Sequence, residues 1–278
     1  MPTSQWVKVN GLNLRYLDYG NAGKPPMVFY HATGFVSELW QPIIRTLQAD
    51  YHCLALDQRG HGGSDKSATE HTWYWTADDF LKFLEALGLT HVIGIGHSSG
   101  ATSIAVAAGR KPALVDRAVL IEPTVRPRVV PPNMIQGNSP LIERTRGRRA
   151  RWPNRETLFA TLFARPPYAS WTDEMKNLFA DHAMTTNANG ELELLCAPAI
   201  EADIYASFPH FDPWPALDQV RQPLLVIHGT GPSVMATMRV DEVMPALPSA
   251  QLVELPDGGH LILMEAPEKI VEAIRAFL

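Results

Sequence analysis

Six short apolar runs, separated by stretches with helical periodicity, constrain the fold of this chain more than any other feature. Most of them are apolar at every position, as in strands of a parallel sheet covered by helices on both faces. One intervening stretch, from Phe80 to Leu87, has apolar residues at helical spacing and is followed by Gly88. We therefore predict an α/β fold with a mostly parallel sheet flanked by helices. The six runs are Met27–Tyr30, Cys53–Leu56, Val92–Ile95, Ala118–Ile121, Leu224–Ile227 and Gln251–Leu255.

The two ends of the chain extend this pattern. Near the N-terminus, the runs Trp6–Val9 and Leu12–Tyr16 flank Asn10-Gly11, a pair of residues typical of a β-hairpin turn. Near the C-terminus, Pro267 suits the first turn of a helix. The apolar residues that follow it fall on one face of that helix.

The alternation of strands and helices stops between Glu122 and Leu224. Residues 124–215 hold two proline pairs, helix-like stretches at about 155–164, 172–184 and 198–206, and no convincing strand. We interpret this segment as a helical insertion between two strands of the sheet. The remaining residues, 1–123 and 216–278, then form the core domain.

The composition excludes several classes of protein. With 24 Lys and Arg against 29 Asp and Glu, the chain has a net charge of −5, which is unlike a basic nucleic-acid binder. No apolar run reaches the roughly 18–20 residues that cross a bilayer, and residues 1–6 lack the features of a signal peptide. Two cysteines cannot build a disulfide framework. We expect a soluble, cytoplasmic enzyme or ligand-binding protein without a nucleic-acid or membrane partner.

One segment departs from this overall charge. Arg144–Arg155 contains six arginines and no acidic residue. Such a run is either a solvated surface or a contact for an anionic group of a substrate. Both interpretations stay open from the sequence alone.

The strongest chemical signal is Gly96-His97-Ser98-Ser99-Gly100, which follows a predicted strand and precedes a helix-like stretch. This is the strand–turn–helix context of a nucleophile elbow. Glycines beside the serine let strand and helix approach closely, and the helix N-terminus favours negative charge. We predict Ser98 as the nucleophile and the backbone N–H of Ser99 as a donor to an oxyanion.

A serine nucleophile needs a base. His260 ends Asp257-Gly258-Gly259-His260, just after the last predicted strand, where the third member of a serine–acid–histidine order is expected. His97, next to the nucleophile on an alternating backbone, is a poor base. His31, His61 and His228 lie near the same sheet edge and are interpreted as structural or pocket-lining residues.

The acid that orients the histidine is less obvious. No acidic residue follows the strand Leu224–Ile227 until Asp241, whereas Glu122 comes directly after Ala118–Ile121. A carboxylate at the end of a strand next to the nucleophile strand is able to reach the same histidine. We therefore assign the acid to Glu122, with Asp212 and Asp241 as weaker alternatives.

A second oxyanion donor is expected in the loop His31–Phe35, after the first parallel strand. The N–H of Thr33 is the candidate, with Ala32 as the alternative. In the loop Asp57–Asp65, Asp57 and Arg59 are interpreted as structural ion-pair residues rather than a catalytic pair. No motif indicates a metal site or a nucleotide cofactor, so none is predicted.

These loops, the Ser98 motif and Gly258-Gly259-His260 together resemble the α/β-hydrolase superfamily, in the same order along nearly the whole chain. The resemblance is to the capped branch, and it implies that residues 124–215 form a helical cap. The position of the acid, after the sixth strand, is similar to its position in haloalkane dehalogenases and in some esterases and lactonases. Serine at position 98 argues against dehalogenases and epoxide hydrolases, which use an aspartate there. The first loop departs from many relatives by reading His-Ala-Thr-Gly.

The function that we expect is hydrolysis of carboxylic esters of small to medium acyl chain through a Ser-His-Glu triad and an acyl-enzyme. A lactonase, a thioesterase or a C–C bond hydrolase would use the same residues, and a ligand-binding receptor on this scaffold is an alternative of another class. The sequence does not reveal the oligomeric state. Candidates for an apolar pocket are His31, Phe35, Trp40, Trp152 and Trp214, although ordinary packing also explains them.

Overall fold

A computed structural model describes residues 1–66, 71–135, 139–231, 239–256 and 258–278. Its centre is an eight-stranded sheet with the order β1-β2-β4-β3-β5-β6-β10-β11. Strands β1 and β2 form the expected hairpin, and β2 also pairs antiparallel with β4, while all other neighbours are parallel. The strands are β1 Thr3–Val9, β2 Leu12–Asp18, β3 Pro26–Tyr30, β4 His52–Leu56, β5 Val92–His97, β6 Val115–Ile121, β10 Leu224–Gly229 and β11 Ala250–Leu255.

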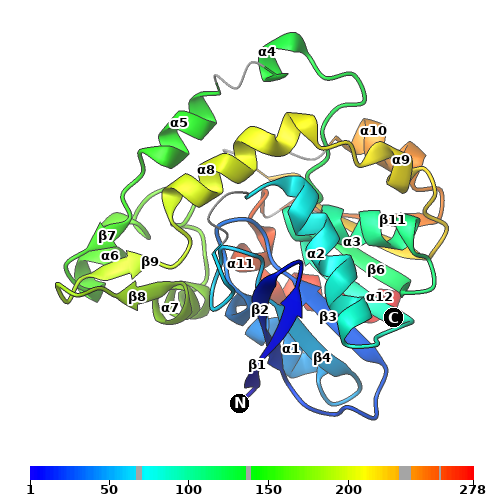
Figure 1. The fold of residues 1–278 in the computed structure, drawn as a ribbon, viewed down its shortest axis with the longest axis horizontal. Helices are drawn as coiled ribbons and strands as arrows, with labels where there is room; N and C mark the ends of the chain where they lie inside the picture. The colour runs from blue at the N-terminus through cyan, green and yellow to red at the C-terminus, as the bar shows by residue number, and fades with distance from the viewer. Residues whose placement is uncertain (67–70, 136–138, 232–238, 257) are drawn as a thin grey trace.

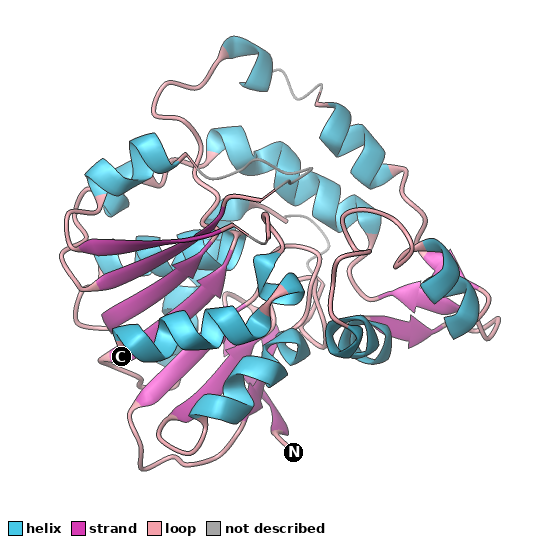
Figure 2. Cartoon of the chain, turned by 180° about the vertical axis from the view of Figure 1, so that it is seen from behind, coloured by secondary structure: helices cyan, strands magenta, loops and turns pink. Residues whose placement is uncertain are grey.

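Helices cover both faces of this sheet (Figure 1), and the view from behind shows the same layering (Figure 2). The prediction of an α/β fold with a mostly parallel sheet flanked by helices is confirmed. The helices of this part are α1 Gln41–Leu47, α2 Trp73–Ala86, α3 Ser99–Arg110, α10 Val240–Ala246, α11 Ile262–Glu265 and α12 Pro267–Phe277.

Strand β3 shows why its sequence is apolar at successive positions. Met27 and Phe29 pack into the apolar cluster on one face of the sheet, and Val28 and Tyr30 pack into the cluster on the other. All four side chains are fully buried. Because strand residues alternate between faces, a strand covered on both sides needs an apolar residue at every position.

Helices are the main regular elements of the segment between β6 and β10, and three of them match the predicted stretches. It also contains a small antiparallel sheet with the order β7-β9-β8, so the prediction that this segment has no strand was wrong. These strands have only two or three residues, too few to give a periodic pattern. The elements are α4 Pro132–Ile135, α5 Pro140–Arg146, β7 Arg151–Trp152, α6 Arg155–Thr161, α7 Asp173–His182, β8 Met184–Thr186, β9 Leu192–Leu194, α8 Pro198–Ser207 and α9 Trp214–Leu217.

In Figure 1, α4, α5 and α8 run above the sheet, while α6, α7 and the small sheet lie to one side. This arrangement places the segment over the carboxyl ends of the parallel strands. In open α/β sheets that edge is where ligands bind. No helix in the described parts of the chain has both the length and the apolar character needed to cross a bilayer.

Candidate active site

Ser98 lies on a sharp turn between β5 and α3. Its backbone has φ 54° and ψ −115°, in a region that residues other than glycine rarely adopt. A Cβ atom on Gly100 would lie 2.1 Å from the Tyr30 carbonyl oxygen, and one on Gly96 would lie 2.6 Å from the Ala101 backbone. Both glycines of the motif are therefore required sterically, as the sequence predicts.

Three side chains that are far apart in the sequence form a continuous polar chain at this turn. The Oγ atom of Ser98 is 3.1 Å from Nε2 of His260, and Nδ1 of His260 is 3.2 Å from Oε2 of Glu122. All three side chains are buried. Since a carboxylate oxygen only accepts, Nδ1 carries the proton and Nε2 is left to accept one from the serine.

Glu122 follows β6 directly, with φ 48°. Its Oε1 accepts the backbone N–H of Gly229 at 2.6 Å and Nδ1 of His228 at 2.7 Å. Burial alone would raise the pKa of Glu122, but the hydrogen bonds from His260, Gly229 and His228 outweigh burial and lower that pKa. The carboxyl is therefore held ionised beside His260.

The two alternative acids lie elsewhere. Asp212 is half exposed and forms an ion pair with Arg126 at 2.8 Å. Asp241 is exposed on α10, in a surface depression with Arg128 and Asp218. Neither carboxylate is hydrogen bonded to His260 among the described contacts, so Glu122 is the acid that the fold brings to this histidine.

Two further histidines of this edge, His97 and His31, have other partners. Nε2 of His97 donates to the carbonyl oxygen of His260 at 2.8 Å, and burial, followed by the neighbouring His260, lowers the pKa of His97 to about 3. His31 uses both ring nitrogens on backbone groups of Ala32 and Gln58. These two rings are neutral structural groups.

The two predicted oxyanion donors are neighbours in space. Ser99 is the first residue of α3, where backbone N–H groups have no partner within the helix. The N–H of Thr33, however, donates to Oγ of Ser99 at 3.0 Å. The same oxygen is 3.0 Å from the Thr33 hydroxyl and accepts from Nε2 of Gln58 at 3.1 Å. The Thr33 N–H is thus occupied by a side chain, a contact that the sequence pattern does not indicate.

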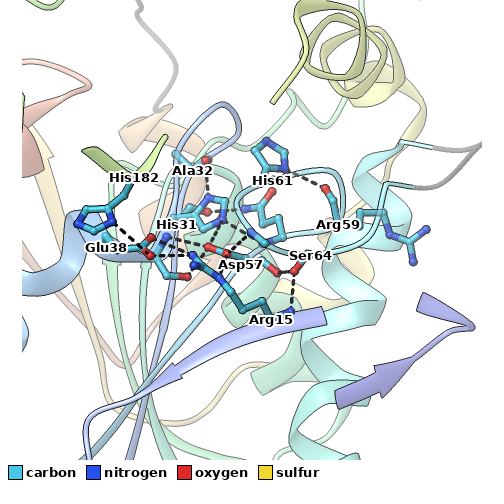
Figure 3. Close-up of polar contacts among 12 residues, drawn as sticks. Arg15, His31, Ala32, Glu38, Asp57, Arg59, His61, Ser64 and His182 are labelled. Carbon is cyan, nitrogen blue, oxygen red and sulfur yellow. Dashed lines mark hydrogen bonds and ion pairs between the residues drawn. The ribbon is translucent and has the colours of Figure 1, made fainter. Parts of the chain in front are cut away.

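Asp57 and Arg59 each have a different ionic partner, so they do not pair with each other. Nε of Arg15 is 2.6 Å from Asp57, and Nε of Arg59 is 2.6 Å from Asp79. Figure 3 shows that Arg15 also reaches Glu38, which lies near His182 of α7. Burial would raise the pKa of Asp57, but the charge of Arg15 lowers it. Asp57 also accepts the backbone N–H groups of Ser37 and Gly63, so this network connects the chain after β3 with the loop after β4.

A cavity of about 430 Å³ opens onto Ser98 and His260. The β3–α1 loop contributes Ala32, Thr33, Gly34 and Phe35 to its wall, and the segment between β6 and β10 supplies much of the remainder. The lining residues from that segment are Thr124, Asn133, Met134, Ser139, Pro140, Leu141, Ile142, Arg148, Pro167, Tyr168, Glu201, Tyr205, Phe208 and Pro209.

Of the five predicted pocket residues, only Phe35 is part of this wall. Trp40 is fully buried and packs against Phe29, with ring centroids 5.4 Å apart. Trp152 donates to the Thr161 hydroxyl, and Trp214 donates to the carbonyl of Arg126. With His31 satisfied by backbone groups, these four residues are corrected to core positions. Core packing explains the apolar character of the three tryptophans.

Sequence reasoning missed the contacts that Thr124 and His228 make at the site. The hydroxyl of Thr124 is 3.1 Å from Oγ of Ser98, two residues after Glu122. His228 was interpreted as structural or pocket-lining and not as a partner of Glu122. Its place at the end of the strand next to β6 was a usable signal. Among the described residues, no group of three or more His, Cys, Asp or Glu side chains has an arrangement suited to a metal ion.

The model of the family described as "Alpha/beta hydrolase family" matches residues 27–273, most of the chain. The chain belongs to this family. It is 25% identical to 2-(acetamidomethylene)succinate hydrolase from Mesorhizobium japonicum, over 99% of this chain and 95% of that protein. It is 29% identical to a non-heme chloroperoxidase from Streptomyces lividans, over 97% of each chain.

A solved structure agrees with these similarities. The crystal structure of E-2-(acetamidomethylene)succinate hydrolase superposes with a TM-score of 0.83 and 26% identity, and covers 100% of this chain and 99% of that one. These matches support a hydrolase of the α/β family. These matches do not identify its substrate.

Proposed function

We propose that this hydrolase cleaves carboxylic esters of small to medium acyl chain through an acyl-enzyme on Ser98. The observation that carries the proposal is the unbroken chain from Ser98 Oγ to His260 Nε2 and from His260 Nδ1 to Glu122. Nucleophile, base and orienting carboxylate are the three parts that acyl transfer by a serine requires.

In this mechanism, His260 takes the proton of Ser98 as its Oγ attacks the carbonyl carbon. Glu122 keeps the imidazole in the productive tautomer and stabilises its charged form. The alcohol leaves with the proton from His260. Water, activated by the same histidine, then releases the acid from Ser98.

The tetrahedral oxyanion needs donors positioned beforehand. We propose that the backbone N–H groups of Ser99 and Thr33 are these donors. The Thr33 N–H would give up its hydrogen bond to Oγ of Ser99 and donate to the oxyanion instead. The exchange is favourable because a charged oxygen is the stronger acceptor. One such donor contributes about 2.7–4 kcal/mol to transition-state binding in a serine hydrolase.

We further propose that residues 124–215 act as a cap that selects substrates by size. Most of the cavity wall beyond the β3–α1 loop comes from this segment, and the cavity volume of about 430 Å³ suits a small or medium acyl group rather than a long lipid. The kcat/KM values of a series of chromogenic esters with increasing acyl chain length measure this size selection. Maximal kcat/KM at long chains would contradict it.

The assignment of Ser98 is tested with two measurements on wild type and Ser98→Ala. We expect ester turnover and fluorophosphonate labelling in the wild type and neither in the variant, with unchanged circular dichroism. Ester hydrolysis by Ser98→Ala would refute the proposed nucleophile. Labelling without turnover of any ester, thioester or lactone would instead favour a receptor.

The assignment of the acid has its own matched pair of variants. Glu122→Gln should lower kcat by orders of magnitude, because the His260 tautomer loses its ionic partner. Asp241→Asn, on exposed α10, should leave kcat near that of the wild type. The reverse ranking would contradict the choice of Glu122.

A further inference from the structure

An ion pair lies in the wall of the cavity that contains Ser98. Nη2 of Arg148 is 2.6 Å from Oε2 of Glu201, and the two side chains are 23% and 8% exposed. Arg148 follows α5 and Glu201 lies on α8. Among the described lining residues, Arg148 is the only lysine or arginine and Glu201 is the only acid.

The structure distinguishes the arginines of the segment Arg144–Arg155 that lie on the solvated surface from the one that lines the cavity. Arg146 and Arg151 form exposed ion pairs with Asp203 and Glu193 and behave as a solvated surface. Arg148 alone among the six arginines is part of the cavity wall. A buried ion pair adds little to stability compared with apolar side chains of similar volume. Its position therefore points to recognition of a substrate group.

The polar neighbours of the pair leave hydrogen-bonding groups unused. Nη1 of Arg148 donates to the Tyr168 oxygen at 3.4 Å, and Tyr205 donates to Oε1 of Glu201 at 3.0 Å. Nε and Nη2 of Arg148 and Oε2 of Glu201 are buried atoms that form no hydrogen bond among the described residues, although Nη2 and Oε2 form the ion pair. The hydroxyl proton of Tyr168 likewise has no acceptor in the described parts of the chain. Donors on Arg148 and Tyr168 thus stand beside an acceptor on Glu201.

The pair is also close to the reacting centre. A Cβ atom on Gly34 would lie 3.2 Å from Oε1 of Glu201. Gly34 adjoins Thr33, whose N–H meets the side chain of Ser99. Ser98 and Glu201 line the same cavity, so a substrate bound at Ser98 is able to extend towards Glu201.

We propose that Arg148, Tyr168 and Glu201 form a subsite for an uncharged substrate group that has both a carbonyl and an N–H, such as an amide. The proposal rests on the proposed function, because it names a substrate class for the same cavity. Arg148 and Tyr168 would donate to the carbonyl, and Glu201 would accept the N–H. The ion pair carries no net charge, so a carboxylate would gain little net attraction there and would lose its hydration. An apolar group would leave the polar atoms unpaired.

The test uses three p-nitrophenyl esters of equal chain length that end in a carboxamide, a carboxylate or an isopropyl group. The carboxamide and isopropyl groups have nearly the same shape. We expect wild-type kcat/KM to be about 10- to 100-fold higher for the carboxamide ester than for the isopropyl ester. The carboxylate ester should be the poorest of the three. A preference for the carboxylate ester would overturn the proposal.

Variants connect the preference to these residues. In Arg148→Met/Glu201→Met, which removes both charges together, the ratio of the two kcat/KM values should fall close to one. The exposed pair offers a matched control, because Arg151→Met/Glu193→Met should keep the wild-type ratio. Tyr168→Phe leaves the ion pair intact and should reduce the ratio several-fold. An unchanged ratio in both subsite variants would overturn the proposal.

Binding separates this inference from the proposed function. In Ser98→Ala, calorimetry with the same esters should show tighter binding of the carboxamide ester than of the isopropyl ester. If this holds and the wild type cleaves none of the three, the subsite stands and the esterase proposal fails. If Ser98→Ala binds the two esters equally, the subsite falls even where the wild type cleaves both.

Discussion

The imidazole of His228 lies closer to the Glu122 carboxylate than the imidazole of His260 does. The distance from Nδ1 of His228 to Oε1 is 2.7 Å, and that from Nδ1 of His260 to Oε2 is 3.2 Å. With the Gly229 N–H also on Oε1, one carboxylate oxygen is held by β10 and the other is directed at His260. His228 is therefore placed to position the acid.

Removing this contact should slow catalysis without removing the triad. We expect His228→Ala to lower kcat about 10- to 100-fold, because a hydrogen bond to a charged group contributes about 1.5–3 kcal/mol. His228→Asn should recover much of the loss, since its amide nitrogen is able to replace Nδ1. Steady-state kinetics on a chromogenic ester measures both. Equal losses in the two variants would contradict a positioning role.

The Ser99 hydroxyl should contribute to stability through the loops that it connects. In Ser99→Ala, the buried donors on Thr33 and Gln58 lose an acceptor, and we expect the free energy of unfolding to fall by about 1–3 kcal/mol. Ser103 donates only to a carbonyl of its own helix. Ser103→Ala is the control and should cost less than about 1 kcal/mol. Urea denaturation compares the two, and a larger loss in Ser103→Ala would refute this role of the Ser99 hydroxyl.

The lowered pKa of Glu122 has a consequence for stability at acid pH. A carboxyl whose pKa is lower in the folded chain than in the unfolded chain, about 4.3, stabilises the fold above that pH. This contribution is lost as the pH falls through the folded-state pKa. The stability difference between wild type and Glu122→Gln should therefore shrink as the pH falls below the unfolded-state pKa of about 4.3. Urea denaturation at several pH values measures it, and a difference that grows at low pH would contradict the shift.

Gly100 should not tolerate a side chain. A Cβ atom there would lie 2.1 Å from the Tyr30 carbonyl oxygen, so Gly100→Ala must displace β3 or α3. We expect loss of ester hydrolysis and a lower melting temperature. A Cβ atom on Gly23 would meet no atom within 4 Å, which makes Gly23→Ala a suitable control, near wild type in both measurements. Full activity in Gly100→Ala would mean that the turn at Ser98 is more adaptable than its geometry indicates.

The sequence by itself determined the strands of the central sheet and the helices between them, the turn at Ser98 and the assignment of Glu122 and His260 as candidates. Each of these depends on local patterns: continuous apolar runs, glycines beside a serine, and polar residues directly after a strand. The parallel arrangement then brings the carboxyl ends of these strands to one edge. This is why residues 98, 122 and 260 meet although Ser98 and His260 are 162 positions apart.

Only the tertiary structure decided which side chains complete the site. His228 reaches Glu122 across 106 positions, and this contact depends on β10 lying beside β6 in the sheet. Likewise, Trp40, Trp152 and Trp214 pack in apolar surroundings, while Arg148 and Glu201 meet in the cavity wall. An apolar or charged residue type is compatible with core, surface or cavity. The contacts made when distant segments pack together select among these environments, and they are absent from any single stretch of sequence.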